Sequence, residues 1–66
     1  MTYSLFHICN GHKTLVRAFA NLDAAKGHAN SLFGAFVACE EDEDNAGHFD
    51  LLTFNGEVLA IEPEYR

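Results

Sequence analysis

The chain has 66 residues, of which 48% are hydrophobic, and ten acidic residues against four basic ones give a formal net charge of −6. A chain of this length forms a single domain, residues 1–66, and its hydrophobic content argues against disorder. The acidic excess disfavours direct binding of nucleic acid, because affinity for a phosphate backbone depends on Lys and Arg side chains. The apolar runs are too short to cross a membrane, and no secretory signal is evident, so we expect a cytoplasmic protein.

Two strands of a β-hairpin are predicted first, at Tyr3–Cys9 and His12–Ala20, because both segments are rich in apolar residues. Asn10 and Gly11 connect them, and this pair favours a type I′ turn, in which both residues have positive φ. The two-residue turn predicts three cross-strand pairs: Phe6 with Leu15, Leu5 with Val16, and Ser4 with Arg17. Alternation then places Phe6, Ile8, Leu15 and Phe19 on one face, and Tyr3, Leu5, Val16 and Ala18 on the other.

The only helix is predicted at Asn21–Phe33. Apolar residues recur at intervals of three and four, at Leu22, Ala25, Ala29, Leu32, Phe33 and Phe36. Asn21 is a favourable N-cap, and Gly34 favours the end of the helix. Gly27 lies inside the helix and costs about 1 kcal/mol relative to Ala, so we expect the helix to depend on packing against a sheet.

Three further strands are predicted after the helix, at Ala35–Glu40, His48–Phe54 and Glu57–Glu62. Asn55-Gly56 repeats the hairpin turn, and Pro63 is expected to end the last strand. The expected faces carry Leu52, Phe54, Leu59 and Ile61 on one side, and Phe49, Leu51, Val58 and Ala60 on the other. The predicted fold is α+β in the order β-β-α-β-β-β, with a mainly antiparallel sheet and the helix packed on one face. The second apolar face must then be covered by curling, by self-association or by a partner.

A run of acidic residues is the most unusual feature of the sequence. It consists of Glu40, Glu41, Asp42, Glu43 and Asp44. If the run is extended, its charges are spaced by about 3.4 Å, close to the phosphate spacing along one strand of DNA. Asp50 and Glu57 are expected to extend the same surface, together with Glu62 and Glu64. The run indicates a surface that binds a basic protein; the alternative is a solvated loop that only keeps the protein soluble.

No pattern in the sequence indicates an enzyme or a cofactor. His7, Cys9 and His12 form an H-x-C-x-x-H pattern, with Cys39 and His48 as further zinc ligands, but the spacing matches no established structural zinc site. The acidic run lacks the alternating ligands and the central Gly of a calcium-binding EF-hand loop. No nucleophile elbow and no phosphate-binding glycine loop occurs. We therefore expect a non-enzymatic protein without metal or cofactor.

The chain resembles small phage-encoded inhibitors of the anti-CRISPR type in its size, its hairpin strands, its acidity and the helix start N-L-D-A-A-K at residues 21–26. The resemblance covers general architecture and charge over most of the chain and includes no diagnostic motif. Some members of that group mimic DNA and occlude the basic groove of a CRISPR effector subunit. The resemblance implies that residues 40–44 face the Lys and Arg side chains that would otherwise hold target DNA, in the cytoplasm of the host cell.

The sequence thus predicts a non-enzymatic inhibitor or interaction module that uses an acidic surface to bind a basic nucleic-acid-binding protein, such as a CRISPR effector subunit. The alternative is a small structural or regulatory homodimer, in which the uncovered sheet face pairs with itself and the acidic loop only solubilises. In that case a charge at an exposed sheet position such as Leu51 or Val58 would disrupt the dimer.

Overall fold

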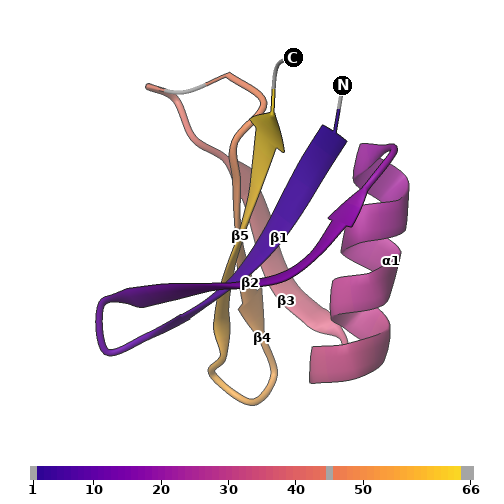
Figure 1. Cartoon of the computed structure of the whole chain (residues 1–66). Coiled ribbons are helices and arrows are strands. Elements are labelled where there is room, and N and C mark those ends of the chain that lie inside the picture. Colours follow the sequence, from indigo (N-terminus) through magenta and orange to yellow (C-terminus); the bar gives the residue numbers. More distant parts are fainter. Residues whose placement is uncertain (1, 45, 65–66) are drawn as a thin grey trace.

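The computed structural model describes residues 2–44 and 46–64, apart from the side chain of residue 37. Within these residues the elements are β1 (Thr2–Cys9), β2 (His12–Phe19), α1 (Leu22–Phe33), β3 (Phe36–Glu41), β4 (Phe49–Thr53) and β5 (Val58–Glu64). The strands form one antiparallel sheet in the order β2-β1-β5-β4-β3, and α1 lies against one side of it (Figure 1). The predicted α+β class and the order β-β-α-β-β-β are confirmed.

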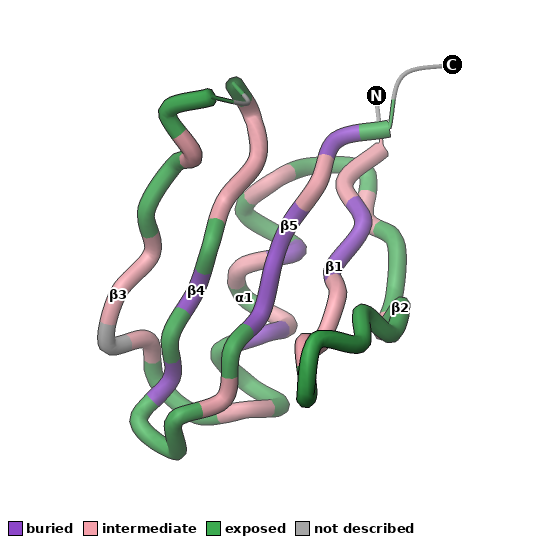
Figure 2. The backbone as a smooth tube through the Cα atoms, turned by 90° about the vertical axis from the view of Figure 1, so that its left-hand side faces the viewer, coloured by how far each residue is buried: buried purple, intermediate pink, exposed green. Residues whose placement is uncertain are grey.

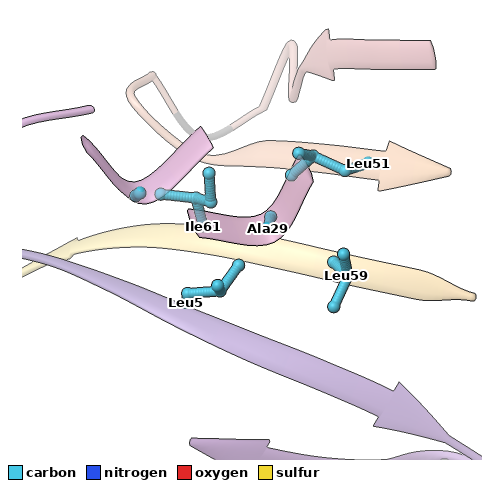
Figure 3. Packing of buried hydrophobic residues seen from close by; sticks show 6 residues of the cluster. Leu5, Ala29, Leu51, Leu59 and Ile61 are labelled. Atoms are coloured by element: carbon cyan, nitrogen blue, oxygen red, sulfur yellow. The ribbon is translucent and has the colours of Figure 1, made fainter. Parts of the chain in front are cut away.

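The hydrophobic core lies between α1 and the three central strands. Ala25 and Ala29 of α1 are completely buried, and their small side chains let the helix approach the sheet closely. The sheet contributes four buried side chains to the same cluster: Leu5, Leu51, Leu59 and Ile61 (Figure 3). Buried residues therefore concentrate on β5, its two neighbours and the helix, whereas the edge strands are more exposed (Figure 2).

The ends of α1 follow the prediction, but one of its expected core residues does not. The side-chain oxygen of Asn21 accepts a hydrogen bond of 2.8 Å from the backbone N–H of Ala24, which makes Asn21 the N-cap. Gly34 follows the last helical residue with φ of 90°. Leu32 is 57% exposed, so its predicted place in the core is wrong. Phe33 packs against the core as predicted, because it continues the row of buried alanines at a spacing of four residues.

The first hairpin turn forms as predicted. Asn10 and Gly11 have φ of 51° and 81°, the positive values that a type I′ turn requires. Near the turn, Phe6 lies opposite Leu15, as expected from a two-residue connection.

Farther from the turn, β2 contains one residue more than β1. Leu5 lies opposite Arg17 rather than Val16, which makes Val16 the extra residue of a β-bulge. The two predicted pairs beyond this point are therefore wrong by one residue. The shift brings Phe19 opposite Tyr3, and both side chains pack against the core rather than on opposite faces as predicted.

The second hairpin is connected by three residues, 54–56, and not by the predicted two. The N–H of Gly56 donates to the carbonyl oxygen of Thr53, and the N–H of Thr53 donates to the carbonyl oxygen of Glu57, both at 3.1 Å. Gly56 has φ of 78°. These features are typical of a turn followed by a glycine bulge, which adds one residue to the connection.

The longer turn shifts the β4–β5 register by one residue. Relative to β5, each β4 side chain therefore lies on the face opposite to the predicted one. Leu51 lies opposite Leu59, and Leu52 lies opposite Val58. A shift of one residue moves every side chain of a strand to the other face. Leu51 is consequently buried in the core, so its expected exposure is wrong, whereas Leu52 and Val58 are exposed.

The last strand continues through Pro63 to Glu64, so the prediction that Pro63 ends it is wrong. Pro63 is buried and lies opposite Tyr3 of β1. The last residue pair between β4 and β5 is Phe49 with Ile61. Beyond Ile61, the described residues of β5 are paired with β1 on one side only. A residue without an N–H is tolerated where one side of the strand lacks a neighbour.

The sheet face that lies away from α1 is called the open face here. Its residues alternate with those of the core. From edge to edge they are Lys13 and Leu15 of β2, Ser4, Phe6 and Ile8 of β1, Val58, Ala60 and Glu62 of β5, Asp50 and Leu52 of β4, and Ala38 and Glu40 of β3. Leu15, Leu52 and Val58 are 56%, 42% and 42% exposed. One helix thus covers only one face of the sheet, as expected.

Candidate functional site

Two carboxylates lie directly opposite each other at one end of the open face. Glu40 of β3 and Asp50 of β4 are partners in the register. Phe49, which precedes Asp50 in β4, lies on the side of the core. The Lys26 ammonium lies 4.9 Å from the centre of its ring. Directly opposed side chains have Cβ atoms about 5 Å apart, so the two negative charges repel each other. Neither carboxylate forms an ion pair with any described residue.

The remainder of the acidic run does not continue as a straight strand. Glu41 ends β3, and the chain bends in the residues that follow. The N–H of Gly47 donates to Oε1 of Glu41 at 2.8 Å, and the N–H of Asp44 donates to Oδ1 of Asp42 at 2.9 Å. These two carboxylates therefore stabilise the loop itself. The even, phosphate-like spacing of an extended run is not realised.

The loop between β3 and β4 is packed against β5. Gly47 has φ of 87°, and a Cβ atom at this position would lie only 3.3 Å from Cγ of Pro63. A side chain at position 47 would therefore crowd Pro63, and Glu43 and Asp44 of the same loop are exposed. The name acidic surface is used below for four exposed residues: Glu40, Glu43, Asp44 and Asp50.

Glu57 does not belong to the acidic surface, although it was expected to extend the surface formed by the acidic run. The β3–β4 loop and the β4–β5 turn lie at opposite ends of the sheet (Figure 1). Oε2 of Glu57 lies 2.5 Å from Nε2 of His7, and the His7 ring stacks on Phe33 with 5.3 Å between ring centres. Glu57 therefore connects the β4–β5 turn to β1, while His7 contacts α1.

Glu62 is paired within the chain and contributes little net charge to the open face. Its Oε1 lies 2.6 Å from Nζ of Lys13 and 3.6 Å from Nδ1 of His48. Nζ of Lys13 also lies 5.0 Å from the centre of the Phe6 ring. The Lys13 side chain thus reaches from β2 across β1 to β5, and no described cation forms an ion pair with Glu40 or Asp50.

A shallow hollow of about 240 Å³ adjoins the opposed carboxylates. It is lined by Ala38, Glu40, Asp50, Leu51, Leu52 and Val58. Small-molecule sites usually measure about 300–1,000 Å³, so this hollow is too small for most metabolites. Sequence reasoning missed its apolar part, because the predicted register placed Leu52 and Val58 on opposite faces. A second hollow of about 290 Å³ lies at the loop, lined by Glu41, Asp42, Glu43 and Ala46.

Of the residues in the H-x-C-x-x-H pattern, His7 is engaged in other contacts, with Glu57 and Phe33. Cys9 and Cys39 are free thiols. In the described part of the chain, no three His, Cys, Asp or Glu side chains come together in a way that could hold a metal ion.

No family model matches the chain, and comparisons with curated proteins and with solved structures give no significant match. None of the described residues forms a helix that is long and apolar enough to cross a membrane.

Proposed function

We propose that the protein is a non-enzymatic inhibitor or interaction module whose acidic surface binds a basic, nucleic-acid-binding protein. The observation that carries this proposal is the pair of Glu40 and Asp50, which two neighbouring strands hold directly opposite each other. Like charges in this arrangement destabilise the fold. Lys or Arg side chains of a partner would remove the repulsion on binding. Glu43 and Asp44 extend the negative charge at the loop.

The partner that fits this surface is a subunit with a basic groove, such as the DNA-recognising subunit of a CRISPR effector complex. The net charge of −6 attracts such a groove and accelerates encounter at low salt. Once bound, the acidic surface occupies Lys and Arg side chains that target DNA needs. Inhibition then results from competition for these cations and does not require phosphate-like spacing along residues 40–44.

A binding experiment with three variants of equal charge tests the proposal. Binding to purified CRISPR effector complexes is measured at about 50 and 200 mM salt, together with displacement of a fluorescent target duplex. Two variants change the acidic surface, Glu40→Gln/Asp50→Asn and Glu43→Gln/Asp44→Asn. The control, Asp23→Asn/Glu57→Gln, removes two charges elsewhere. We expect the wild type and the control to bind and to displace DNA, more weakly at the higher salt, and both surface variants to lose affinity.

Equal binding by all three variants would contradict the role of the acidic surface. Failure of the wild type to bind any basic effector would also overturn the proposal, and would leave the acidic residues as a solubilising surface.

A homodimer through the open face is the second candidate function, and the exposure of Leu15, Leu52 and Val58 favours it. Charge opposes it, because a second copy would bring its own Glu40 and Asp50 to the same face. Sedimentation over a range of concentrations distinguishes the two. A wild-type dimer that Val58→Glu converts into a folded monomer would support self-association, and a wild-type monomer at every concentration would dispose of it.

A further inference from the structure

The hollow on the open face has apolar and acidic walls in a regular arrangement. On β3, Ala38 and Glu40 are two residues apart, and Leu52 and Asp50 of β4 lie opposite them. The apolar pair and the acidic pair are therefore about 7 Å apart along the strands, because each residue of an antiparallel strand advances about 3.4 Å. Val58 of β5 lies opposite Leu52 and borders the apolar end.

We propose that this hollow receives one arginine side chain of the basic partner. The apolar stem of the arginine lies on Leu52 and Val58, and its guanidinium group lies between the carboxylates of Glu40 and Asp50. This inference rests on the proposed function and names the contact that anchors the partner. It makes the open face, rather than the exposed loop, the centre of the interface.

The size and composition of the hollow fit a side chain better than a free ligand. Its volume of about 240 Å³ lies below that of typical metabolite sites. The small Ala38 lies opposite Leu52 and lines the hollow, and both Leu52 and Val58 are 42% exposed. Interface anchors typically insert into such small pockets near the centre of a contact, and arginine is enriched among them.

The two opposed carboxylates favour arginine over lysine. A guanidinium group is planar, carries five N–H donors and is weakly hydrated, so it can donate to both carboxylates at once. The lysine ammonium is a compact and strongly hydrated charge, which loses more on leaving water. The arginine stem is also apolar along its length and can cover exposed leucine and valine surface.

The three basic side chains that the structure describes, Lys13, Arg17 and Lys26, each have a contact within the chain. The guanidinium carbon of Arg17 lies 5.8 Å from the centre of the Phe19 ring, and Phe19 packs against the core on the side of α1. Lys13 is bound to Glu62, and Lys26 lies over Phe49. Charge complementarity therefore favours a basic partner over self-association at this hollow.

Titration of the protein with N-acetyl-arginine-N-methylamide tests the inference directly. Binding is followed by the backbone amide shifts of β3 and β4 in two-dimensional ¹H–¹⁵N spectra. The corresponding lysine derivative tests the preference for guanidinium, and the citrulline derivative keeps the shape of arginine without its charge. We expect saturable shifts centred on residues 38–40 and 50–52 with arginine, weaker binding with lysine and no saturable binding with citrulline.

Three variants locate the site on the same spectra, which also show whether each variant is folded. Glu40→Gln/Asp50→Asn removes the acidic wall, and Val58→Thr makes the apolar wall polar at nearly constant shape. Glu43→Gln/Asp44→Asn removes the same charge outside the hollow. The first variant is expected to abolish saturable binding and the second to weaken it, whereas the third retains it.

The outcomes separate this inference from the proposed function. Arginine binding at the hollow without any binding to basic effector complexes would support the site and overturn the proposed function. Binding to an effector that Glu40→Gln/Asp50→Asn leaves intact would overturn the arginine site and leave the loop carboxylates as the contact. Equal shifts with arginine, lysine and citrulline, or shifts spread over the whole surface, would also overturn it.

Discussion

Glu40 and Asp50 lie opposite each other on β3 and β4, on the face of the sheet that α1 leaves uncovered. Neither residue has an ion-pair partner among the described side chains. In contrast, Glu41 and Asp42 accept hydrogen bonds from their own loop. The acidic run therefore has two parts, one that holds the loop together and one that is free to engage a partner.

Removal of either opposed charge should stabilise the fold. We expect Glu40→Gln or Asp50→Asn to raise the free energy of unfolding by about 0.2–1 kcal/mol, because a like-charged cross-strand pair is relieved. Urea denaturation at low and high salt measures this gain, which shrinks as salt screens the repulsion. Asp23→Asn is the matched control: Asp23 lies in the first turn of α1, and its neutralisation should lower stability by about 0.3–1 kcal/mol. A loss of stability in all three variants would show that the repulsion is negligible.

Two adjacent leucines test the register of the second hairpin. Leu51 is 1% exposed and Leu52 is 42% exposed. Leu51→Ala should therefore cost about 2–5 kcal/mol of unfolding free energy, as expected for a truncation in the core. Leu52→Ala lies outside the core and should cost less than about 1 kcal/mol. The opposite order in urea denaturation would indicate the register of a two-residue turn instead.

The contact between His7 and Glu57 should contribute modestly to stability. Their side chains are 29% and 42% exposed, so solvent screens the interaction, and a double-mutant cycle of His7→Phe and Glu57→Gln should give a coupling of about 0.5–1 kcal/mol. His7→Phe keeps an aromatic ring against Phe33 and so isolates the polar contact. A parallel cycle of His7→Phe with Glu64→Gln, at an exposed position of β5, should show no coupling. Similar values in both cycles would mean that His7 acts through packing alone.

Replacement of the glycine inside α1 should stabilise the protein. Gly27 is exposed, and a Cβ atom there would meet no atom outside the adjoining backbone of the helix within 4 Å. Gly27→Ala should therefore raise the free energy of unfolding by up to about 1 kcal/mol through helix propensity. The reverse change at an exposed helical alanine, Ala24→Gly, should lower it. Thermal unfolding followed by circular dichroism checks both, and an unchanged or lower melting temperature for Gly27→Ala would contradict this account of the helix.

Local chemistry alone was sufficient for several features of the fold. The turn at Asn10 and Gly11, the N-cap at Asn21 and the end of α1 at Gly34 each depend on the conformational preference of one or two residues. The order of the elements followed from the spacing of apolar residues, because that spacing reflects which side of each element is buried.

The sequence by itself thus determined the class of the fold, the limits of the helix and the presence of a concentrated negative charge. Only the tertiary structure decided the registers of the two hairpins, because packing against the core selects a bulge at Val16 and a three-residue turn before Glu57. Those registers in turn decided that Glu40 faces Asp50, and that Leu52 and Val58 share the open face with them. A shift of one residue reverses the direction of every side chain in a strand. A site that spans three strands therefore depends on contacts between segments far apart in the sequence, which local sequence patterns do not predict.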